Sequence, residues 1–189
     1  MTSRTGRSRG RTSTRSLETA KIFVTVGTDH HPFDRMVNWF DSWLATRDPD
    51  QLATLVQRGT SREGRSASVQ YLGFEDLQKE IKSADIVVTH GGPGSIIECR
   101  RWGKLPIVVP RDPALGEHID DHQILFCERM AAQGQILLAR SAADLAELLD
   151  SGLASPRTVE PFDHSHVDRT AARIGSIVDS LVGDRGARS

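Results

Sequence analysis

The side chains best suited to chemistry lie between residues 85 and 123. An apolar run at 86–89 leads into His90–Ser95, which reads His-Gly-Gly-Pro-Gly-Ser, and a helical pattern opened by Ser95 follows. The first N–H groups of a helix lack intrahelical partners, and the helix dipole favours negative charge there. Glycine also lets the backbone approach an oxyanion closely. The segment therefore predicts a phosphate-binding turn, with an ordinary strand-to-helix turn as the alternative.

Glu98 is open to two interpretations from its position alone. It lies three residues after Ser95, and Ser-x-x-Glu is the pattern of a capping box, which satisfies the start of a helix. A carboxylate can also accept hydrogen bonds from two hydroxyl groups at once, as a ribose would offer them. Arg111, which follows the apolar run 107–109, is equally open. It could stabilise the negative charge of a ligand or pair with nearby acidic side chains.

A second polar cluster, at 117–123, contains His118, His122 and Gln123 among acidic residues. The two histidines stand four residues apart, a spacing that can place two metal ligands on one helix face. Neither a His-Glu-x-x-His pattern nor a cysteine pair accompanies them, so we predict no bound metal and no cofactor. Gln123 offers both a donor and an acceptor, which suits the vicinal hydroxyls of a sugar.

The first apolar run ends in Gly27-Thr28, a glycine turn that could help to hold phosphate or simply join a strand to a helix. Asp29, His30 and His31 come next. Histidine and aspartate can act as general bases, so all three are candidates for that role, with Asp29 and His30 put first. The residues alone leave the catalytic base unassigned.

Strand and helix patterns alternate along the chain, with turn residues between them. This alternation predicts a doubly wound, Rossmann-like parallel sheet with helices on both faces. Ligands of such sheets bind outside the carboxyl ends of the strands, where both glycine turns would lie. Trp39 and Trp43, four residues apart in the first helix, are expected in the core, with a partner-binding face as the alternative. The expected strands are 21–27, 52–56, 69–72, 86–89, 107–109 and 136–138, and the helices are 32–45, 74–83, 93–102, 119–133, 142–149 and 167–182.

Composition limits the class of protein. Apolar residues make up 38% of the 189 residues, enough for the core of one domain. Aromatic residues make up only 5%, which argues against a stacking platform for nucleic acid, so no nucleic-acid partner is predicted. Two cysteines, Cys99 and Cys127, imply no disulfide framework. No run approaches the roughly 20 apolar residues of a membrane span, so a cytoplasmic location is expected.

The charge of the chain is unevenly spread. Residues 1–16 hold five arginines and no acidic residue, so the rest of the chain carries a net charge near −6. This arginine-rich segment also lacks the apolar residues that offset the entropy of ordering. We predict a disordered basic tail at 1–18, a folded domain at 19–183 and a flexible tail at 184–189. Contact with anionic lipid or nucleic acid is the alternative role for the arginines.

Together these segments resemble the glycosyltransferase family 28 C-terminal domain, the donor-binding half of MurG-like GT-B glycosyltransferases. The resemblance is closer to stand-alone members of that family. These are the PssE-like exopolysaccharide subunits and the catalytic subunit of the UDP-GlcNAc transferase that forms dolichol-linked chitobiose. The resemblance covers about residues 21–149 and rests on Val24–Thr28 with Phe33-Asp34, Ala84-Asp85, His90-Gly91-Gly92 through Glu98, Pro110-Arg111, and Glu117-His118 through Gln123.

The resemblance implies a set of residues that bind a nucleotide-sugar donor. Glu98 would accept hydrogen bonds from both ribose hydroxyls, Gln123 would bind hydroxyls of the sugar, and His90 would contact the diphosphate. Relatives often carry Ala or Asn where this chain has Pro93, which offers no N–H. Such enzymes need no bound metal, because helix N-termini stabilise the leaving diphosphate. The full implied set is Gly27, Thr28, His90, Gly91, Gly92, Gly94, Ser95, Glu98, Arg111, His122 and Gln123.

The resemblance also implies a function: the donor-binding, catalytic subunit of a two-subunit, inverting, UDP-sugar-dependent hexosyltransferase. A membrane-associated partner would hold the acceptor, a sugar on a polyprenyl diphosphate, in exopolysaccharide or related glycan synthesis. The chain would then lie at the inner face of the membrane through that partner. One alternative is a non-catalytic nucleotide-sugar-binding or assembly protein of the same fold. Another is a nucleotide-dependent oxidoreductase, which the absence of Gly-x-Gly-x-x-Gly after the first strand disfavours.

Overall fold

The computed structural model describes residues 19–161. Several predictions concern segments outside this range: the tails 1–18 and 184–189 and the last helix, 167–182. Within the range, the doubly wound parallel sheet is confirmed. Its strands are β1 (Ala20–Thr25), β2 (Leu52–Gln57), β3 (Ala67–Val69), β4 (Ile86–His90), β5 (Ile107–Val109) and β6 (Leu137–Leu138), and they lie in the order β3-β2-β1-β4-β5-β6.

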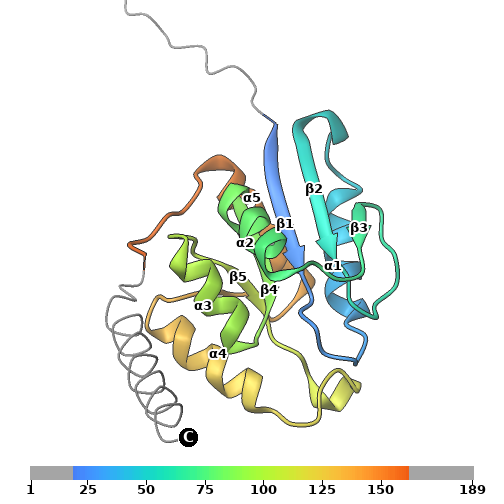
Figure 1. Ribbon diagram of the computed structural model, residues 1–189, viewed down its shortest axis with the longest axis vertical. Coiled ribbons are helices and arrows are strands. Elements are labelled where there is room, and N and C mark those ends of the chain that lie inside the picture. Colours follow the sequence, from blue (N-terminus) through green and yellow to red (C-terminus); the bar gives the residue numbers. More distant parts are fainter. Residues whose placement is uncertain (1–18, 162–189) are drawn as a thin grey trace, which may run out of the picture.

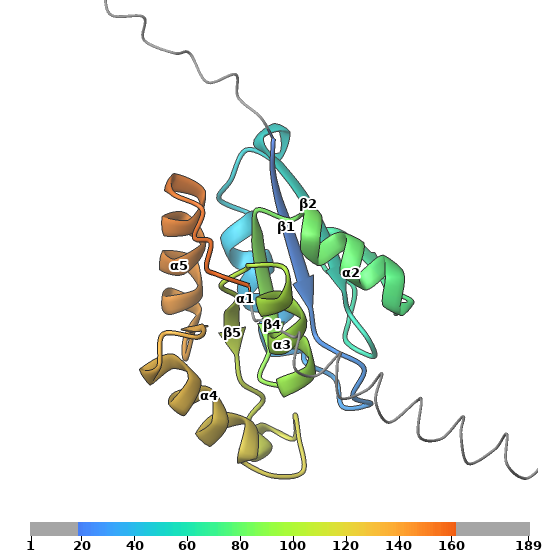
Figure 2. The ribbon, with the colours of Figure 1, turned by 60° about the vertical axis from the view of Figure 1, so that its left-hand side comes forward.

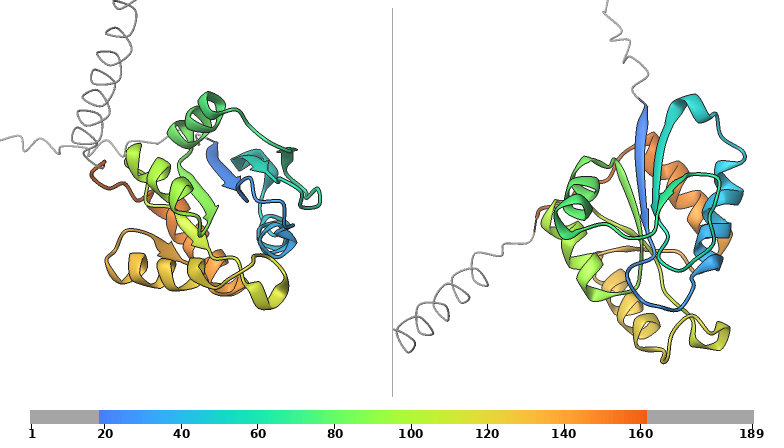
Figure 3. Two further views of the ribbon diagram at one scale, coloured as in Figure 1. Left: turned by 60° about the horizontal axis from the view of Figure 1, so that its bottom comes forward. Right: turned by 45° about the vertical axis from the view of Figure 1, so that its right-hand side comes forward.

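Five α-helices connect the strands and cover both faces of the sheet. Helices α1 and α5 pack against one face of the strands, and α2, α3 and α4 pack against the other. Figures 2 and 3 show α5 and α2 on opposite sides of the strands. This arrangement follows from the parallel pairing, because each crossover must pass over a face of the sheet. The helices are α1 (Asp34–Leu44), α2 (Phe74–Ser83), α3 (Pro93–Arg101), α4 (His122–Ala132) and α5 (Ala142–Ala154), with short 3₁₀ helices η1 (Pro49–Gln51) and η2 (Pro113–Leu115).

The alternation of side chains along the strands places a hydrophobic core on each face. Along β1, Ile22 and Val24 point to the layer of α1 and α5, whereas Phe23 points to α2 and α3. All three side chains are fully buried, as expected for a central parallel strand. Trp43 belongs to the first of these cores, and its indole N–H donates to Asp150 on α5 at 2.8 Å, which confirms its predicted core position.

Three predicted boundaries differ from the structure by three residues or more, and the others by two at most. The third strand is Ala67–Val69 instead of 69–72, and Val69 pairs with Gln57 of β2. Helix α4 begins at His122 instead of 119, because Ile119 is 81% exposed and offers no buried helical face. Helix α5 continues to Ala154 instead of ending at 149, and Leu153 extends its packing against the core.

The sheet order reverses between β1 and β4, the two central strands (Figure 1). From β1 the chain builds outward to β2 and β3, and it then returns to place β4 on the other side of β1. The two strands pair in parallel, with Thr25 opposite Thr89, so their carboxyl ends lie at the same edge. A crevice that can hold a ligand forms at such a reversal point. The loops that begin at Gly27 and Gly91 both emerge there.

Candidate functional site

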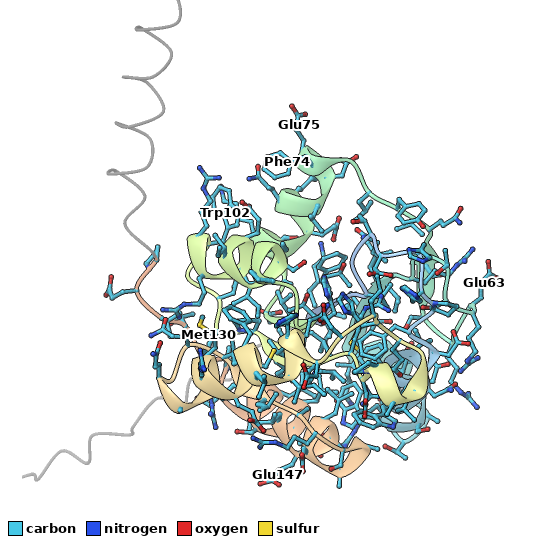
Figure 4. All side chains as sticks on the ribbon, turned by 90° about the horizontal axis from the view of Figure 1, so that it is seen from below. Glu63, Phe74, Glu75, Trp102, Met130 and Glu147 are labelled. Atoms are coloured by element: carbon cyan, nitrogen blue, oxygen red, sulfur yellow. The ribbon has the colours of Figure 1, made fainter. Side chains whose placement is uncertain are left out.

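A pocket of about 660 Å³ opens at the reversal point, within the size range of small-molecule sites. Its residues come from the ends of β1, β2 and β4, the starts of α2 and α3, and the start of α4. Figure 4 views this edge from below and shows Phe74 at the start of α2. The residues that line the pocket are Thr25, Gly27, Thr28, Asp29, Gln57, Phe74, Leu77, His90, Gly92, Pro93, Gly94, Ser95, Ile97, Glu98 and Gln123.

The imidazole ring of His90 is held between two glycines at the end of β4. A Cβ atom on Gly27 would lie 2.3 Å from its Nε2, and a Cβ on Gly92 would lie 2.2 Å from its Cε1. Neither distance is possible for real atoms, so only glycine fits at these two positions while the ring stays in place. Gly27 also has a φ of +80°, which disfavours other residues independently. The two predicted glycine turns thus both pack against the His90 ring.

Hydrogen bonds define which nitrogen of His90 carries the proton. The backbone N–H of Gly92 donates to Nδ1 at 3.1 Å, so Nδ1 is an acceptor and the neutral ring is protonated at Nε2. Nε2 lies 3.1 Å from the hydroxyl oxygen of Ser95. Desolvation, followed by the charge of Arg111, lowers the pKa of His90 to about 4. At neutral pH the ring is therefore an uncharged donor whose N–H lies at the pocket, suited to an oxyanion.

This low pKa predicts a loss of stability in acid. The unfolded chain takes up a proton on His90 below its ordinary pKa of 6.5, whereas the folded chain resists until about 4. Stability is therefore full above pH 6.5 and falls with decreasing pH, by about 3 kcal/mol at pH 4, since one pKa unit is worth about 1.36 kcal/mol. Urea unfolding at several pH values should show this slope in wild type, and His90→Gln should flatten it. An imidazole NMR titration of His90 centred near pH 6.5 would contradict the assignment.

Helix α3 begins at Pro93, as predicted, and this start removes one interpretation of Glu98. Gly92 is the N-cap and Pro93 is the first helical residue, so Ser95 lies inside the first turn. The capping-box interpretation is therefore wrong for this helix. Because Pro93 has no N–H, the unpaired donors of the first turn come from Gly94 and Ser95. A Cβ on Gly94 would meet nothing within 4 Å, so this stretch of backbone faces open space in the pocket.

Glu98 lies one turn along α3, on the wall of the pocket. One carboxylate oxygen accepts a hydrogen bond from the side chain of Gln78 at 3.0 Å, and the other lies 3.5 Å from Arg101. The Glu98 side chain is 16% exposed. Beside it, Phe74, Leu77 and Ile97 form an apolar wall. A positioned carboxylate next to apolar surface can bind a polyhydroxylated ring that carries an aromatic base.

Arg111 is fully buried beneath the ligand edge, at 0% exposure. Its guanidinium donates to the carbonyl oxygens of Val26 at 2.8 Å, His31 at 2.8 Å and Glu117 at 3.0 Å. These contacts hold Arg111 within the protein through backbone carbonyls, and not through the acidic side chains that the sequence suggested. The charges of Asp29 and Glu117 offset the desolvation that lowers the pKa of Arg111. Arg111 therefore joins the loop between β1 and α1 to the loop between β5 and α4 beneath the pocket.

The cluster at 117–123 separates into residues with different surroundings. Gln123 lines the pocket and contacts His90, whereas His122 points into solvent with 83% of its side chain exposed. His118 precedes α4, so the two histidines do not share a helix face as the metal alternative required. Both lie against Asp120, at 3.4 and 2.9 Å. Gly91, also predicted at the site, packs against Gln123 and Cys127 of α4.

The candidate bases also differ in position. Asp29 lines the pocket, and its carboxylate accepts from the backbone N–H of His31 at 2.8 Å and lies 2.7 Å from His31 Nδ1. Desolvation acts to raise the pKa of Asp29, but these hydrogen bonds and the charge of Arg111 outweigh it, so the pKa is lowered. His30 is 81% exposed at its side chain. Asp29 is thus an ionised group at the pocket wall.

Sequence reasoning missed Gln57, the last residue of β2. It is 2% exposed, its side-chain N–H donates to the carbonyl of Gly27 at 3.2 Å, and it lines the pocket. Its Oε1 has no hydrogen-bond partner among residues 19–161. A buried, unpaired acceptor is unusual and suggests a ligand donor. The one signal in the sequence is a polar residue ending an apolar strand, at the edge where ligands of parallel sheets bind.

Comparison with models of protein families identifies the family of this chain. The glycosyltransferase family 28 C-terminal domain matches residues 21–169, most of the chain. The chain therefore belongs to the glycosyltransferase family 28 C-terminal domain family. The predicted donor-half fold of GT-B glycosyltransferases is consistent with this membership.

Two curated relatives are UDP-N-acetylglucosamine transferase subunits named ALG13. The Yarrowia lipolytica protein is 34% identical over 70 residues, which cover 35% of this chain and 34% of the relative. The Kluyveromyces lactis protein is 36% identical over 85 residues, 43% of this chain and 40% of the relative. The matched segments thus span about two fifths or less of these relatives.

Solved structures show the same fold. An NMR structure of ALG13 aligns with a TM-score of 0.52 at 18% identity and covers 78% of this chain and 92% of that protein. MurG of Acinetobacter baumannii aligns with a TM-score of 0.50 at 17% identity, with 79% of this chain matching 48% of MurG. The match to about half of MurG agrees with a fold that forms one half of a GT-B enzyme.

Proposed function

We propose that the chain is the donor-binding, catalytic subunit of a two-subunit inverting glycosyltransferase that uses a UDP-sugar. The observation that carries this proposal is the convergence of His90, the first turn of α3 and Glu98 on one pocket at the reversal point of the sheet. The diphosphate would bind the N–H groups of Gly94 and Ser95 and the Nε2–H of His90. The ribose hydroxyls would bind Glu98, and Gln123 would bind the sugar.

The same residues support a direct displacement at the anomeric carbon. The acceptor hydroxyl oxygen would form a bond to that carbon while the bond to the β-phosphate oxygen breaks, and UDP leaves with the electron pair. The positive end of α3 and the neutral His90 donor would stabilise the charge on the leaving diphosphate. A base must take the hydroxyl proton. Of the candidates, Asp29 is ionised and lines the pocket, so we propose it ahead of His30.

A partner subunit would complete the enzyme by holding the acceptor. The names of the ALG13 relatives describe subunits of a transferase, which supports a two-chain assembly here. Within the described part of the chain, no helix is long and apolar enough to cross a membrane. We propose a membrane-associated partner that presents a polyprenyl-diphosphate-linked sugar, in exopolysaccharide or related glycan synthesis. The chain would bind at the inner face of the membrane through that partner.

Replacing Glu98 tests the donor site directly. Glu98→Ala removes the acceptor proposed for the ribose, and a hydrogen bond to a charged group is worth about 1.5–3 kcal/mol. We expect UDP affinity to fall by about 10- to 100-fold, measured by isothermal titration calorimetry with UDP and several UDP-sugars. Glu147→Ala is the matched control, because Glu147 is exposed on α5, away from Phe74 and the pocket (Figure 4).

The outcomes separate the proposal from its rivals. Equal UDP binding by wild type and Glu98→Ala would contradict the ribose assignment. Tight binding of NAD or ADP in place of UDP would favour a different nucleotide enzyme. Saturable UDP-sugar binding without transfer, in the presence of every copurifying membrane protein, would favour the non-catalytic binding protein.

A further inference from the structure

A histidine–aspartate cluster at the mouth of the pocket contains two side chains that the proposed function does not use. Asp29, His30 and His31 each place one ligand atom within 4.8 Å of the others. We propose that these three residues form a binding site for a divalent transition-metal ion of the Zn²⁺ type. This inference does not rest on the proposed function, because metal binding can be measured without any nucleotide.

The distances fit a single ion. Zinc binds histidine nitrogen and carboxylate oxygen at about 2.0–2.2 Å, so neighbouring ligand atoms in a tetrahedral site lie roughly 3.3 Å apart. Asp29 Oδ1 is 2.7 Å from Nδ1 of His31 and 3.7 Å from Nδ1 of His30. These two separations lie on either side of the expected value. A small rotation of the exposed His30 ring, whose centroid lies 3.9 Å from that of His31, would adjust the longer separation. Asp29 Oδ1 and Nδ1 of His31 would have to move apart by about 0.6 Å.

The backbone of the three ligands is fixed by contacts from elsewhere in the fold. The carbonyl of His31 accepts from buried Arg111 at 2.8 Å, and the carbonyl of His30 accepts from the Thr60 hydroxyl at 3.0 Å. The second oxygen of Asp29 lies 3.7 Å from Nε2 of His118. The first two contacts hold the backbone of both histidines in place, and His118 lies beside the Asp29 carboxylate. The cluster is thus oriented in advance, although it lies in the loop between β1 and α1.

The cluster offers a metal ion three protein ligands and leaves one coordination position free for water or another ligand. Asp29 supplies the negative charge that attracts a cation, and the positive charge of Arg111 offsets part of it. Three protein ligands leave the fourth tetrahedral position open, as in zinc sites that bind water or substrate. Because Asp29 lines the pocket, that position opens towards the space beside His90.

Calorimetric titration of Zn²⁺ into tag-free, chelator-treated full-length protein tests the site. We expect one Zn²⁺ per chain for wild type. His30→Ala should weaken binding at least as much as the loss of an outer partner, which typically costs about 10- to 100-fold, and Asp29→Asn should weaken it further. The exposed position of His30 means that His30→Ala should fold normally, which thermal melting would verify. Titration with Co²⁺ should give a visible absorption band without a thiolate band.

Two control variants exclude other histidines. His122→Ala removes an exposed histidine that is likewise paired with a carboxylate, that of Asp120, and it should bind Zn²⁺ as wild type does. A double variant, His164→Ala with His166→Ala, removes the two histidines outside the described residues and should also bind normally. The proposal is overturned if wild type does not bind Zn²⁺, if His30→Ala and Asp29→Asn bind as tightly as wild type, or if either control loses binding.

Discussion

Arg111→Leu should destabilise the protein by about 3–5 kcal/mol, because each buried acceptor left without its donor costs about 1–3 kcal/mol. The substitution leaves three carbonyl oxygens without their donor and leaves Asp29 and Glu117 without the cation that offsets them. Glu117 keeps its bidentate pair with Arg35, at 2.9 and 2.6 Å, so part of the network remains. Urea unfolding measures the change directly.

A conservative variant and a surface control sharpen this prediction. Arg111→Lys keeps the charge but cannot reproduce three donors in one plane, so it should remain clearly destabilised. Arg140→Leu removes a 63% exposed arginine that lies 3.5 Å from Glu128, and it should cost less than about 1 kcal/mol. If Arg111→Leu were as mild as Arg140→Leu, Arg111 would not fasten the loops, and a role in ligand binding would regain support.

Gly27→Ala should remove most UDP binding and also destabilise the fold. The added Cβ would overlap Nε2 of His90, so the ring must leave its position and lose its contacts with Gly92 and Ser95. Loss of one donor to the charged diphosphate is worth about 1.5–3 kcal/mol, so UDP affinity should fall at least about tenfold. Calorimetry with UDP and thermal melting of the same sample would separate the two effects.

Gly134→Ala is the matched control for backbone strain. Gly134 has a φ of +66°, close to the +80° of Gly27, but a Cβ there would meet nothing within 4 Å. Both variants carry the cost of a left-handed conformation, about 1–2 kcal/mol, and only Gly27→Ala also displaces His90. Equal UDP affinity in the two variants would show that His90 does not contact the ligand.

Local patterns predicted most of the fold. The apolar runs that became β1, β2, β4 and β5 and the periodic segment of α2 are found within a few residues of their predicted ranges, because burial on both faces leaves a plain signal. The third strand was misplaced because Ser66-Ala67-Ser68 lacks the large apolar residues that mark a strand. The fourth helix was predicted to begin at Ile119, three residues too early, because an apolar residue need not be buried.

The site was harder to predict wherever it depends on contacts between distant segments. That His90 needs glycine at position 27 follows only from the approach of two loops 63 residues apart in sequence. The buried environment of Arg111 depends on Val26 and His31, which lie 80 or more residues away. The Ser95-x-x-Glu98 spacing fits a capping box, but the helix start at Pro93 cannot be read from that spacing. Residue types therefore predicted the members of the pocket better than their roles.

A crystal structure of the protein with UDP tests the central claim most directly. We expect one UDP in the pocket, with its diphosphate within hydrogen-bond distance of the N–H groups of Gly94 and Ser95 and of Nε2 of His90. Both ribose hydroxyls should lie on the Glu98 carboxylate. UDP bound elsewhere on the chain, or bound in the pocket with its ribose away from Glu98, would contradict the assignment of this pocket as the donor site.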